Sequence, residues 1–171
     1  KMFEELDEAI ETLGRNTTLS SDAWSRYDGV YYGNIAQWLK YANSLKLRMA
    51  MRLTEVKPEL AQAKAAEAIA GGVITSNADN AAMHAAENRT TLIYNDWGDH
   101  RVGADILCYM TGYNDPRVEK MFLPNDAGNY VGIRIGIDVA GKSTAMTKYS
   151  NLIVESTTPY LWFNAAEATF L

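Results

Sequence analysis

The segment around Trp97 holds residues that are well suited to bind a polar ligand. Tyr94, Asn95, Asp96 and Trp97 are consecutive, and they show neither a helical nor an alternating apolar pattern. Aromatic rings stack on the apolar C–H faces of sugars, and neighbouring amide and carboxylate oxygens bind hydroxyl groups. We therefore expect Trp97, helped by Tyr94 and Asp96, to form part of a ligand-contacting surface.

A second pair of aromatic residues, Trp24 and Tyr27, lies in a polar segment that contains several glycines. Residues 15–33 read RNTTLSSDAWSRYDGVYYG, which is typical of a surface loop. These two rings form a second candidate platform for ligand binding. The sequence leaves open the alternative that these rings, like Trp97, pack into the core beneath their loops.

The segment from Gly136 to Ser143 matches the phosphate-binding pattern G-x-x-x-x-G-K-S. Such a loop follows a strand and cradles phosphates with its backbone amides. Apolar residues alternate over residues 131–137, which predicts a strand at the required place. However, too few residues follow Ser143 for a nucleotide-binding α/β domain, and the preceding sequence is rich in helical patterns. We therefore expect a surface loop in which Lys142 is exposed and binds no nucleotide.

Acidic residues and a histidine gather near Trp97, but their pattern is weak as a catalytic or metal-binding signature. They are Asp96, Asp99, His100 and Asp105. A pair of carboxyl groups could catalyse glycosidic bond cleavage, and the same groups could hold a cation. A run of this kind is more typical of a solvated loop. The sequence predicts no catalytic residue, no bound metal and no cofactor.

The composition excludes several classes of protein. The chain has 171 residues, of which 47% are hydrophobic and 22% are charged, and its net charge is −5. These values indicate one globular domain without a basic surface for nucleic acid. No apolar run approaches the length of a membrane-spanning helix. The single cysteine, Cys108, excludes an internal disulfide, and we expect it to be a small buried residue on the apolar face of a short helix over residues 103–111.

Two helical segments in the first half form the clearest structural pattern. Apolar residues recur at spacings of three and four over residues 34–54, while Lys40, Lys46, Arg48 and Arg52 lie off that stripe. Residues 58–70 are rich in alanine, which permits close antiparallel packing with Trp38 buried between the two helices. This pair resembles a tetratricopeptide hairpin. We expect a mainly α fold, with a tetratricopeptide-like hairpin scaffold and an irregular, loop-rich lobe that contains short strands.

The two ends of the chain also carry helical signals. Apolar residues mark one face of a helix over residues 1–13, with Gly14 as its stop. Asn164 and Glu167 form a capping box, yet Leu171 ends the chain four residues later. We expect residues 1–171 to be a single domain and a piece of a longer protein, in which the apolar residues at this end find a partner.

The stretch from Asp28 to Ala50, DGVYYGNIAQWLKYANSLKLRMA, resembles the SusD/RagB family of nutrient-binding outer-membrane lipoproteins. The family pattern has Gly-Asp before a helix and then Trp-Lys-x-Ala-Asn-Ser-Leu-Lys-Leu-Arg. Here Asn34 replaces the aspartate, and Leu39 separates Trp38 from Lys40. Further matches in the same order are Gly-Gly-Val-Ile74, Ser76-Asn-Ala-Asp-Asn80, Asp115-Pro-Arg117 and Asn164-Ala-Ala-Glu167-Ala, so the resemblance covers nearly the whole chain.

This resemblance implies a tetratricopeptide-like scaffold and the capture of glycans at the surface of a Bacteroidetes-type cell. It also implies delivery of the oligosaccharide to a TonB-dependent transporter, without catalysis. Family members are tethered by an N-terminal lipidated cysteine, and because Cys108 lies in mid-chain, the tether would lie upstream of this sequence. No binding residue is carried over by motif. The alternative that stays open is a tetratricopeptide-type interaction module that binds peptides.

Overall fold

The computed structural model describes residues 1–19, 22, 24–84 and 88–171, apart from the side chains of residues 94 and 95. The chain divides into two compact units, one formed by Lys1–Ala85 with Pro159–Leu171 and the other by Ala86–Thr158. Helices dominate both units, which confirms the mainly α fold. Within the described ranges, no helix is both long enough and apolar enough to cross a membrane. The single domain expected over residues 1–171 stays a prediction.

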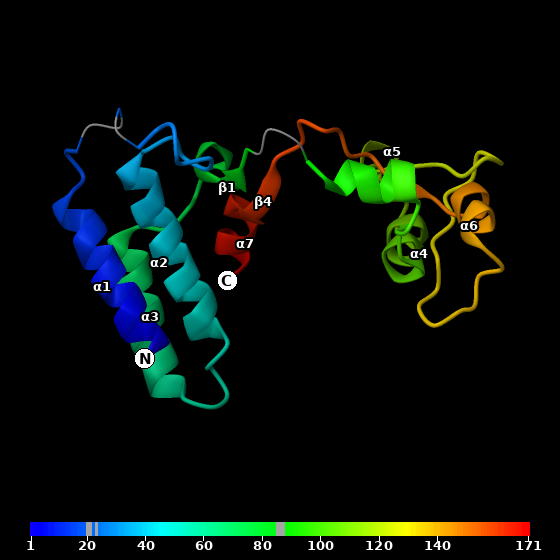
Figure 1. Cartoon of the computed structure of the whole chain (residues 1–171). Coiled ribbons are helices and arrows are strands. Elements are labelled where there is room, and N and C mark those ends of the chain that lie inside the picture. Colours follow the sequence, from blue (N-terminus) through cyan, green and yellow to red (C-terminus); the bar gives the residue numbers. More distant parts are fainter. Residues whose placement is uncertain (20–21, 23, 85–87) are drawn as a thin grey trace. The chain divides into compact units, whose positions relative to one another are not determined.

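The first unit is built on three helices that lie side by side (Figure 1). They are α1 (Met2–Arg15), α2 (Ile35–Met51) and α3 (Pro58–Gly71). A short helical turn, η2 (Asn77–Asp79), leads into a two-stranded antiparallel sheet of β1 (Ala81–Met83) and β4 (Tyr160–Phe163), and α7 (Ala165–Phe170) follows it. The predicted helices over residues 34–54 and 58–70 are therefore confirmed.

Helix ends follow the capping signals, with one exception. The Asn34 side chain accepts a hydrogen bond from the N–H of Gln37 at 3.2 Å, and Asn164 accepts one from the N–H of Glu167 at 2.7 Å. These bonds satisfy amide groups that have no partner in the first turn of a helix. The prediction of a stop at Gly14 is wrong, because α1 continues through Gly14 to Arg15.

The contact among the three long helices contains a buried ammonium group. The side chain of Lys46 is only 7% exposed, and its Nζ lies 2.6 Å from both Asp7 Oδ1 on α1 and Glu67 Oε2 on α3. Lys64 Nζ approaches the same two carboxylates at 2.9 Å. The sequence pattern places Lys46 off the apolar stripe of α2, yet the residue is buried because α1 and α3 cover two sides of this helix.

A second ion pair joins α2 to the C-terminal segment. Arg48 Nε donates to Glu167 Oε1 at 2.6 Å, and the guanidinium group lies 4.2 Å from the centre of the Phe163 ring. Phe163 is in the core of this unit, with Val30, Tyr31, Ile74 and Ala81. The pair therefore fixes residues of β4 and α7 against a helix that is far away in the sequence. Phe170, near the end of α7, is exposed.

The position of Trp38 differs from the prediction. Its ring is half-buried and meets Tyr31 and Tyr41 edge-on, with ring centres 5.3 and 5.8 Å apart. Tyr31 is in the turn before α2, and Tyr41 is on α2 itself. The expected burial of Trp38 between α2 and α3 is therefore wrong. Between those two helices, Asn43 Nδ2 donates to the carbonyl of Gly71 at 3.0 Å. A side chain at Gly71 would collide with Asn43.

The second unit contains shorter elements around its own core. They are η3 (Leu92–Trp97), which is π-helical, α4 (Ala104–Gly112), α5 (Val118–Met121), α6 (Lys142–Lys148), and a sheet of β2 (Phe122–Leu123) and β3 (Asn151–Leu152). The core contains Val102, Leu107, Met110, Val118 and Phe122. The predicted helix over residues 103–111 is confirmed.

The strand expected over residues 131–137 does not form. Ile133 forms a single parallel bridge to Gly103, and the carbonyl of Val131 accepts one hydrogen bond from the N–H of Ser150 at 2.7 Å. Next to Ile133, Gly132 approaches the backbone so closely that a Cβ would lie 2.5 Å from the Cα of Ala104. Gly136 then turns the chain with a φ of 80°. The alternating pattern therefore reflects close packing at glycines and not a ladder of hydrogen bonds.

Cys108 is exposed, which contradicts its expected burial. Leu107 and Met110 are three residues apart, so they lie on the same face of α4, and both are buried in the core. Successive residues on a helix lie about 100° apart, so Cys108 falls outside that narrow stripe.

We predict that Lys46→Met lowers the free energy of unfolding by about 2 kcal/mol. Removing one partner of a buried ion pair costs about 3–5 kcal/mol, and the partial exposure of Asp7 and Glu67 reduces that cost. Urea unfolding at neutral pH measures the change. Lys57→Met, at an exposed lysine of the same unit, is the control and should be nearly neutral. Equal stability of the two variants would contradict a structural role of the buried ammonium group.

Candidate functional site

Trp97 ends the π-helical segment η3, and its side chain is 50% exposed. The next residue, Gly98, is left-handed with a φ of 64°, a conformation that glycine adopts readily. A Cβ on Gly98 would also lie 2.7 Å from Met146 Sδ of α6. The backbone directly after Trp97 is therefore held close to α6. The Trp97 ring is still partly exposed and accessible to a ligand.

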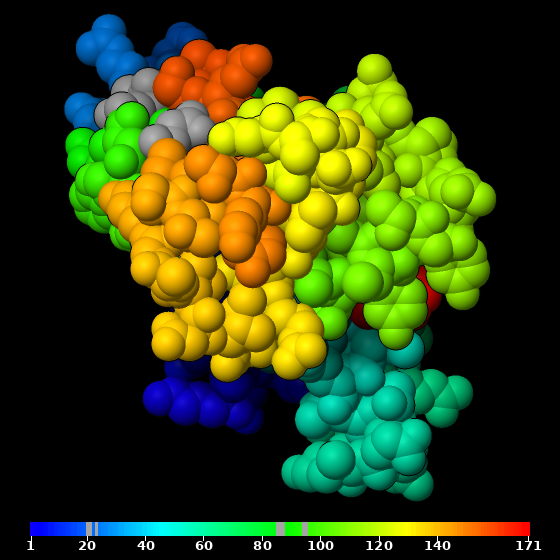
Figure 2. All heavy atoms as spheres, turned by 90° about the vertical axis from the view of Figure 1, so that its right-hand side faces the viewer, coloured from blue at the N-terminus to red at the C-terminus, as the bar shows by residue number. Residues whose placement is uncertain are grey.

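A hollow of about 510 Å³ begins at Gly98, directly after Trp97. Its lining combines charged and apolar groups, among them Asp99, His100, Arg101, Ile133, Val139 and Lys142. Arg101 Nε donates to the carbonyl of Ala145 at 3.3 Å, which joins the loop to α6. Figure 2 shows the surface of α6 beside that of the loop that leads to it. A hollow with both charged and apolar walls, which begins one residue after a half-exposed tryptophan, suits a ligand that has both apolar faces and hydroxyl groups.

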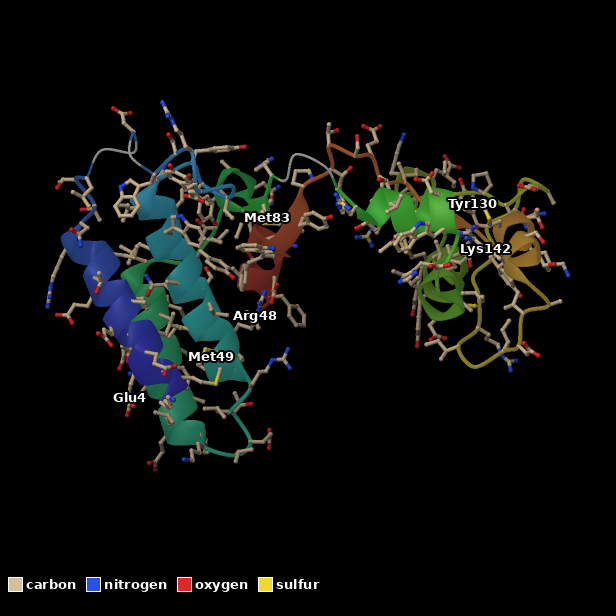
Figure 3. All side chains as sticks on the ribbon, in the orientation of Figure 1. Glu4, Arg48, Met49, Met83, Tyr130 and Lys142 are labelled. Atoms are coloured by element: carbon tan, nitrogen blue, oxygen red, sulfur yellow. The ribbon has the colours of Figure 1, made fainter. Side chains whose placement is uncertain are left out.

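Lys142 is exposed, as predicted from the Gly-Lys-Ser motif, and it is the first residue of α6 (Figure 3). Residues 131–137 supply no strand before this helix, so the element that a phosphate-binding loop requires is missing there. Lys142 instead lies near Gly98, and its Cε would be 3.1 Å from a Cβ at that glycine. The motif therefore contributes one wall of the hollow.

The other predicted residues of this segment have different outcomes. Asp96 is exposed. Tyr94 is part of η3, but its side chain lies outside the described residues. Asp99 and His100 are also exposed, in keeping with a solvated loop, whereas Asp105 is exposed in the first turn of α4. In the described parts of the chain, no three acidic, histidine or cysteine side chains are close enough together to hold a metal ion.

The second predicted platform belongs to the first unit. The N–H groups of Tyr27 and Asp28 both donate to the carbonyl of Trp24, at 2.8 and 3.0 Å, and so form one tight turn. Tyr27 is 89% exposed, and Trp24 is 49% exposed. Trp24 also lines a pocket of about 430 Å³ between α1 and the start of α2. The structure thus groups Trp24 with Tyr27 in one unit, and Tyr94, Asp96 and Trp97 in the other.

Asp28 holds the turn together, a role that the sequence patterns do not reveal. Its carboxylate accepts hydrogen bonds from the backbone N–H groups of Val30, Tyr31 and Gly33 and from Trp38 Nε1, the last at 2.7 Å. Burial by itself would raise the pKa of Asp28. The hydrogen bonds from Trp38 and the three backbone amides outweigh burial, so the pKa lies below its ordinary value. The carboxylate is therefore ionised at neutral pH.

The whole chain matches one protein family. The family model described as SusD-like, the SusD and RagB outer membrane lipoproteins, matches residues 1–171. Among curated proteins, none matches the chain.

Solved structures of similar proteins agree with the family match. A SusD homologue from Bacteroides thetaiotaomicron is 45% identical over 99% of this chain, with a TM-score of 0.94. A SusD homologue from Bacteroides uniformis is 40% identical over 98% of this chain, with a TM-score of 0.85. A chitin-binding SusD homologue from Flavobacterium johnsoniae is 35% identical over 99% of this chain, with a TM-score of 0.89. The matched regions are 37%, 36% and 37% of those three proteins, so the chain spans a little over a third of their length.

We predict that Asp28→Asn lowers the free energy of unfolding by about 2 kcal/mol at pH 7, because hydrogen bonds to a charged group contribute about 1.5–3 kcal/mol. The pKa of Asp28 is lower in the folded chain than in the unfolded chain. Its contribution is therefore present above the unfolded value of about 3.9 and is lost as the pH falls through the folded value. The difference between variant and wild type should shrink on acidification, as measured by urea unfolding at a series of pH values. Glu8→Gln, at an exposed position of α1, is the control, and a difference that does not change with pH would contradict the prediction.

Proposed function

The chain belongs to the SusD-like family of outer membrane lipoproteins, and from this membership we propose that it contributes to binding an oligosaccharide nutrient at the bacterial cell surface. The bound oligosaccharide is then delivered to a TonB-dependent transporter in the same membrane. The chitin-binding activity named for the Flavobacterium johnsoniae homologue supports a glycan as the ligand. The chain's role is binding, with no catalytic step.

The observation that carries the glycan proposal is the half-exposed Trp97, which is followed at once by the first residue of the hollow. Trp97 is half-exposed, so part of its ring is available to stack on a ligand. The hollow that begins at Gly98 has the volume of a small-ligand site. We assign the sugar stacking to Trp97 and the contacts with hydroxyl groups to Asp96. Tyr94 is part of the same proposed surface, and Trp24 with Tyr27 forms a second one.

The competing proposal, a groove for acidic peptides, would need free cationic groups on the helices. The long helices instead use their cations in ion pairs. Lys40 contacts Asp79 at 2.7 Å, and Arg48 contacts Glu167 at 2.6 Å. Lys46 and Lys64 both bind Asp7 and Glu67. A peptide tail would have to break these pairs, and this cost favours the glycan proposal.

We propose that a lipid anchor upstream of this chain provides the attachment to the membrane. The family description as outer membrane lipoproteins supports this placement. Cys108 lies within α4, in the middle of the chain, so it is not at an N-terminal position of the kind that carries the lipid in this family. Attachment through such an anchor would place the binding surface outside the lipid.

The test compares Trp97→Ala with Trp97→Phe. We predict that the alanine variant loses at least about tenfold in affinity for the oligosaccharide, a change that corresponds to about 1.4 kcal/mol. The phenylalanine variant should retain most of the affinity, because its ring still stacks. A glycan array that includes chitin oligosaccharides first selects the ligand, and isothermal titration calorimetry then measures the affinity.

Thermal unfolding of the two variants separates binding from packing. Unchanged stability with lost affinity supports the proposed surface. Unchanged affinity and unchanged stability of Trp97→Ala would contradict the role of Trp97. A strongly destabilised alanine variant would mean that the ring is part of the core.

A further inference from the structure

The pocket between α1 and the start of α2 belongs to the first unit and shares no residue with the hollow beside Trp97. Its volume is about 430 Å³, which lies within the range of about 300–1,000 Å³ for small-ligand sites. Its apolar lining consists of two indoles and three aliphatic side chains, namely Trp24, Trp38, Leu13, Leu19 and Ile35. This composition is that of a ligand pocket, in which a few polar groups accompany a mainly apolar wall.

Asp28 holds the indole of Trp38 and the backbone of Trp24 in place. Its carboxylate accepts the Nε1–H of Trp38 at 2.7 Å, and its own backbone N–H donates to the carbonyl of Trp24 at 3.0 Å. Trp38 is held further by the edge-on contacts with Tyr31 and Tyr41. The Trp38 wall and the backbone that carries Trp24 are therefore positioned before any ligand arrives, which lowers the entropic cost of binding.

The polar groups of the pocket are largely engaged within the protein. The Asp28 carboxylate accepts four hydrogen bonds, which occupy about as many lone-pair sites as two carboxylate oxygens offer. Asn16 Nδ2 donates to the carbonyl of Thr12 at 2.7 Å. No lysine, arginine or histidine is among the described residues that line the pocket. The charge among the described lining residues is the Asp28 carboxylate, whose hydrogen-bonding positions are already occupied.

From this geometry we propose that the pocket binds a neutral aromatic ring, presented as an aryl substituent on a sugar or another small molecule. Indoles attract other rings in offset or edge-on arrangements, which adds to the gain from apolar burial. An anionic ligand would face the Asp28 carboxylate, and no cation among the described lining residues would compensate it. This proposal concerns a site separate from Trp97 and does not rest on the glycan proposal there; Trp24 belongs both to this pocket and to the second glycan surface proposed above.

The test uses the indole N–H signals of the four tryptophans in proton–nitrogen NMR spectra of the isotope-labelled chain. Tryptophan-to-phenylalanine variants assign the signals. Phenyl β-glucoside and methyl β-glucoside are the two probes, since they share the sugar and differ in the aryl group. We expect the phenyl compound to shift the signals of Trp24 and Trp38 in a saturable manner, with a millimolar dissociation constant, while the methyl compound leaves them unchanged.

Three variants make the result specific. Trp24→Ala removes one wall, and Thr12→Phe fills the pocket from α1; each should weaken binding of the phenyl compound by about tenfold or more. Thr18→Phe is the matched control, because Thr18 is exposed and does not line the pocket. It should bind like the wild type. Thr12→Phe keeps the test valid if Trp24→Ala fails to fold.

Several outcomes would overturn the proposal. One is the absence of any shift at Trp24 and Trp38 with the phenyl compound. Another is an equal response to both glucosides, which would assign the pocket to the sugar ring and not to the aryl group. A third is full retention of binding in Thr12→Phe. Failure of the glycan assay at Trp97 has no bearing on these measurements.

Discussion

The ammonium group of Lys46 is the constraint on which the helical part of this structure depends. A charge that is almost fully withdrawn from water needs nearby counter-charges, and Asp7 and Glu67 supply them from two different helices. Two residues further along α2, Arg48 binds Glu167 from a different part of the chain. Positions two apart on a helix point in different directions. Polar side chains of α2 therefore bind partners on more than one side, so this helix is the centre of its unit.

Local signals predicted the elements that depend on local physics. The helices that follow Asn34 and Pro58 form where the caps, the apolar spacing and the stop signals agree. The burial of Lys46 was not predicted and that of Trp38 was predicted wrongly, because both depend on which elements cover each face of α2. The alternation over residues 131–137 fails as a strand signal for a similar reason. A strand needs a neighbour to pair with, and Gly132 brings the backbone of Ala104 too close for a regular ladder.

In the candidate sites, too, local features could be predicted from the sequence, whereas contacts between distant segments could not. The exposure of Trp97 could be anticipated, since no periodic pattern marks that tryptophan for burial. The wall that α6 contributes to the adjacent hollow could not, because the contact of Gly98 with Met146 joins segments far apart in the sequence. The sequence analysis included Asp28 only as part of the stretch that resembles the family, and assigned it no structural role. Its four hydrogen bonds depend on the fold of the turn from Asp28 to Gly33, and no spacing rule specifies that fold.

The pairing of β1 with β4 makes Ala86–Thr158 an insertion between two adjacent strands of one small sheet. The entropic cost of closing a long connection grows only with the logarithm of its length, and a doubling adds about 0.6 kcal/mol. Residues could therefore be gained or lost in the inserted lobe at little cost to the helical frame. In evolutionary terms, the frame can be inherited almost unchanged while the lobe that carries Trp97 is rebuilt for a different ligand.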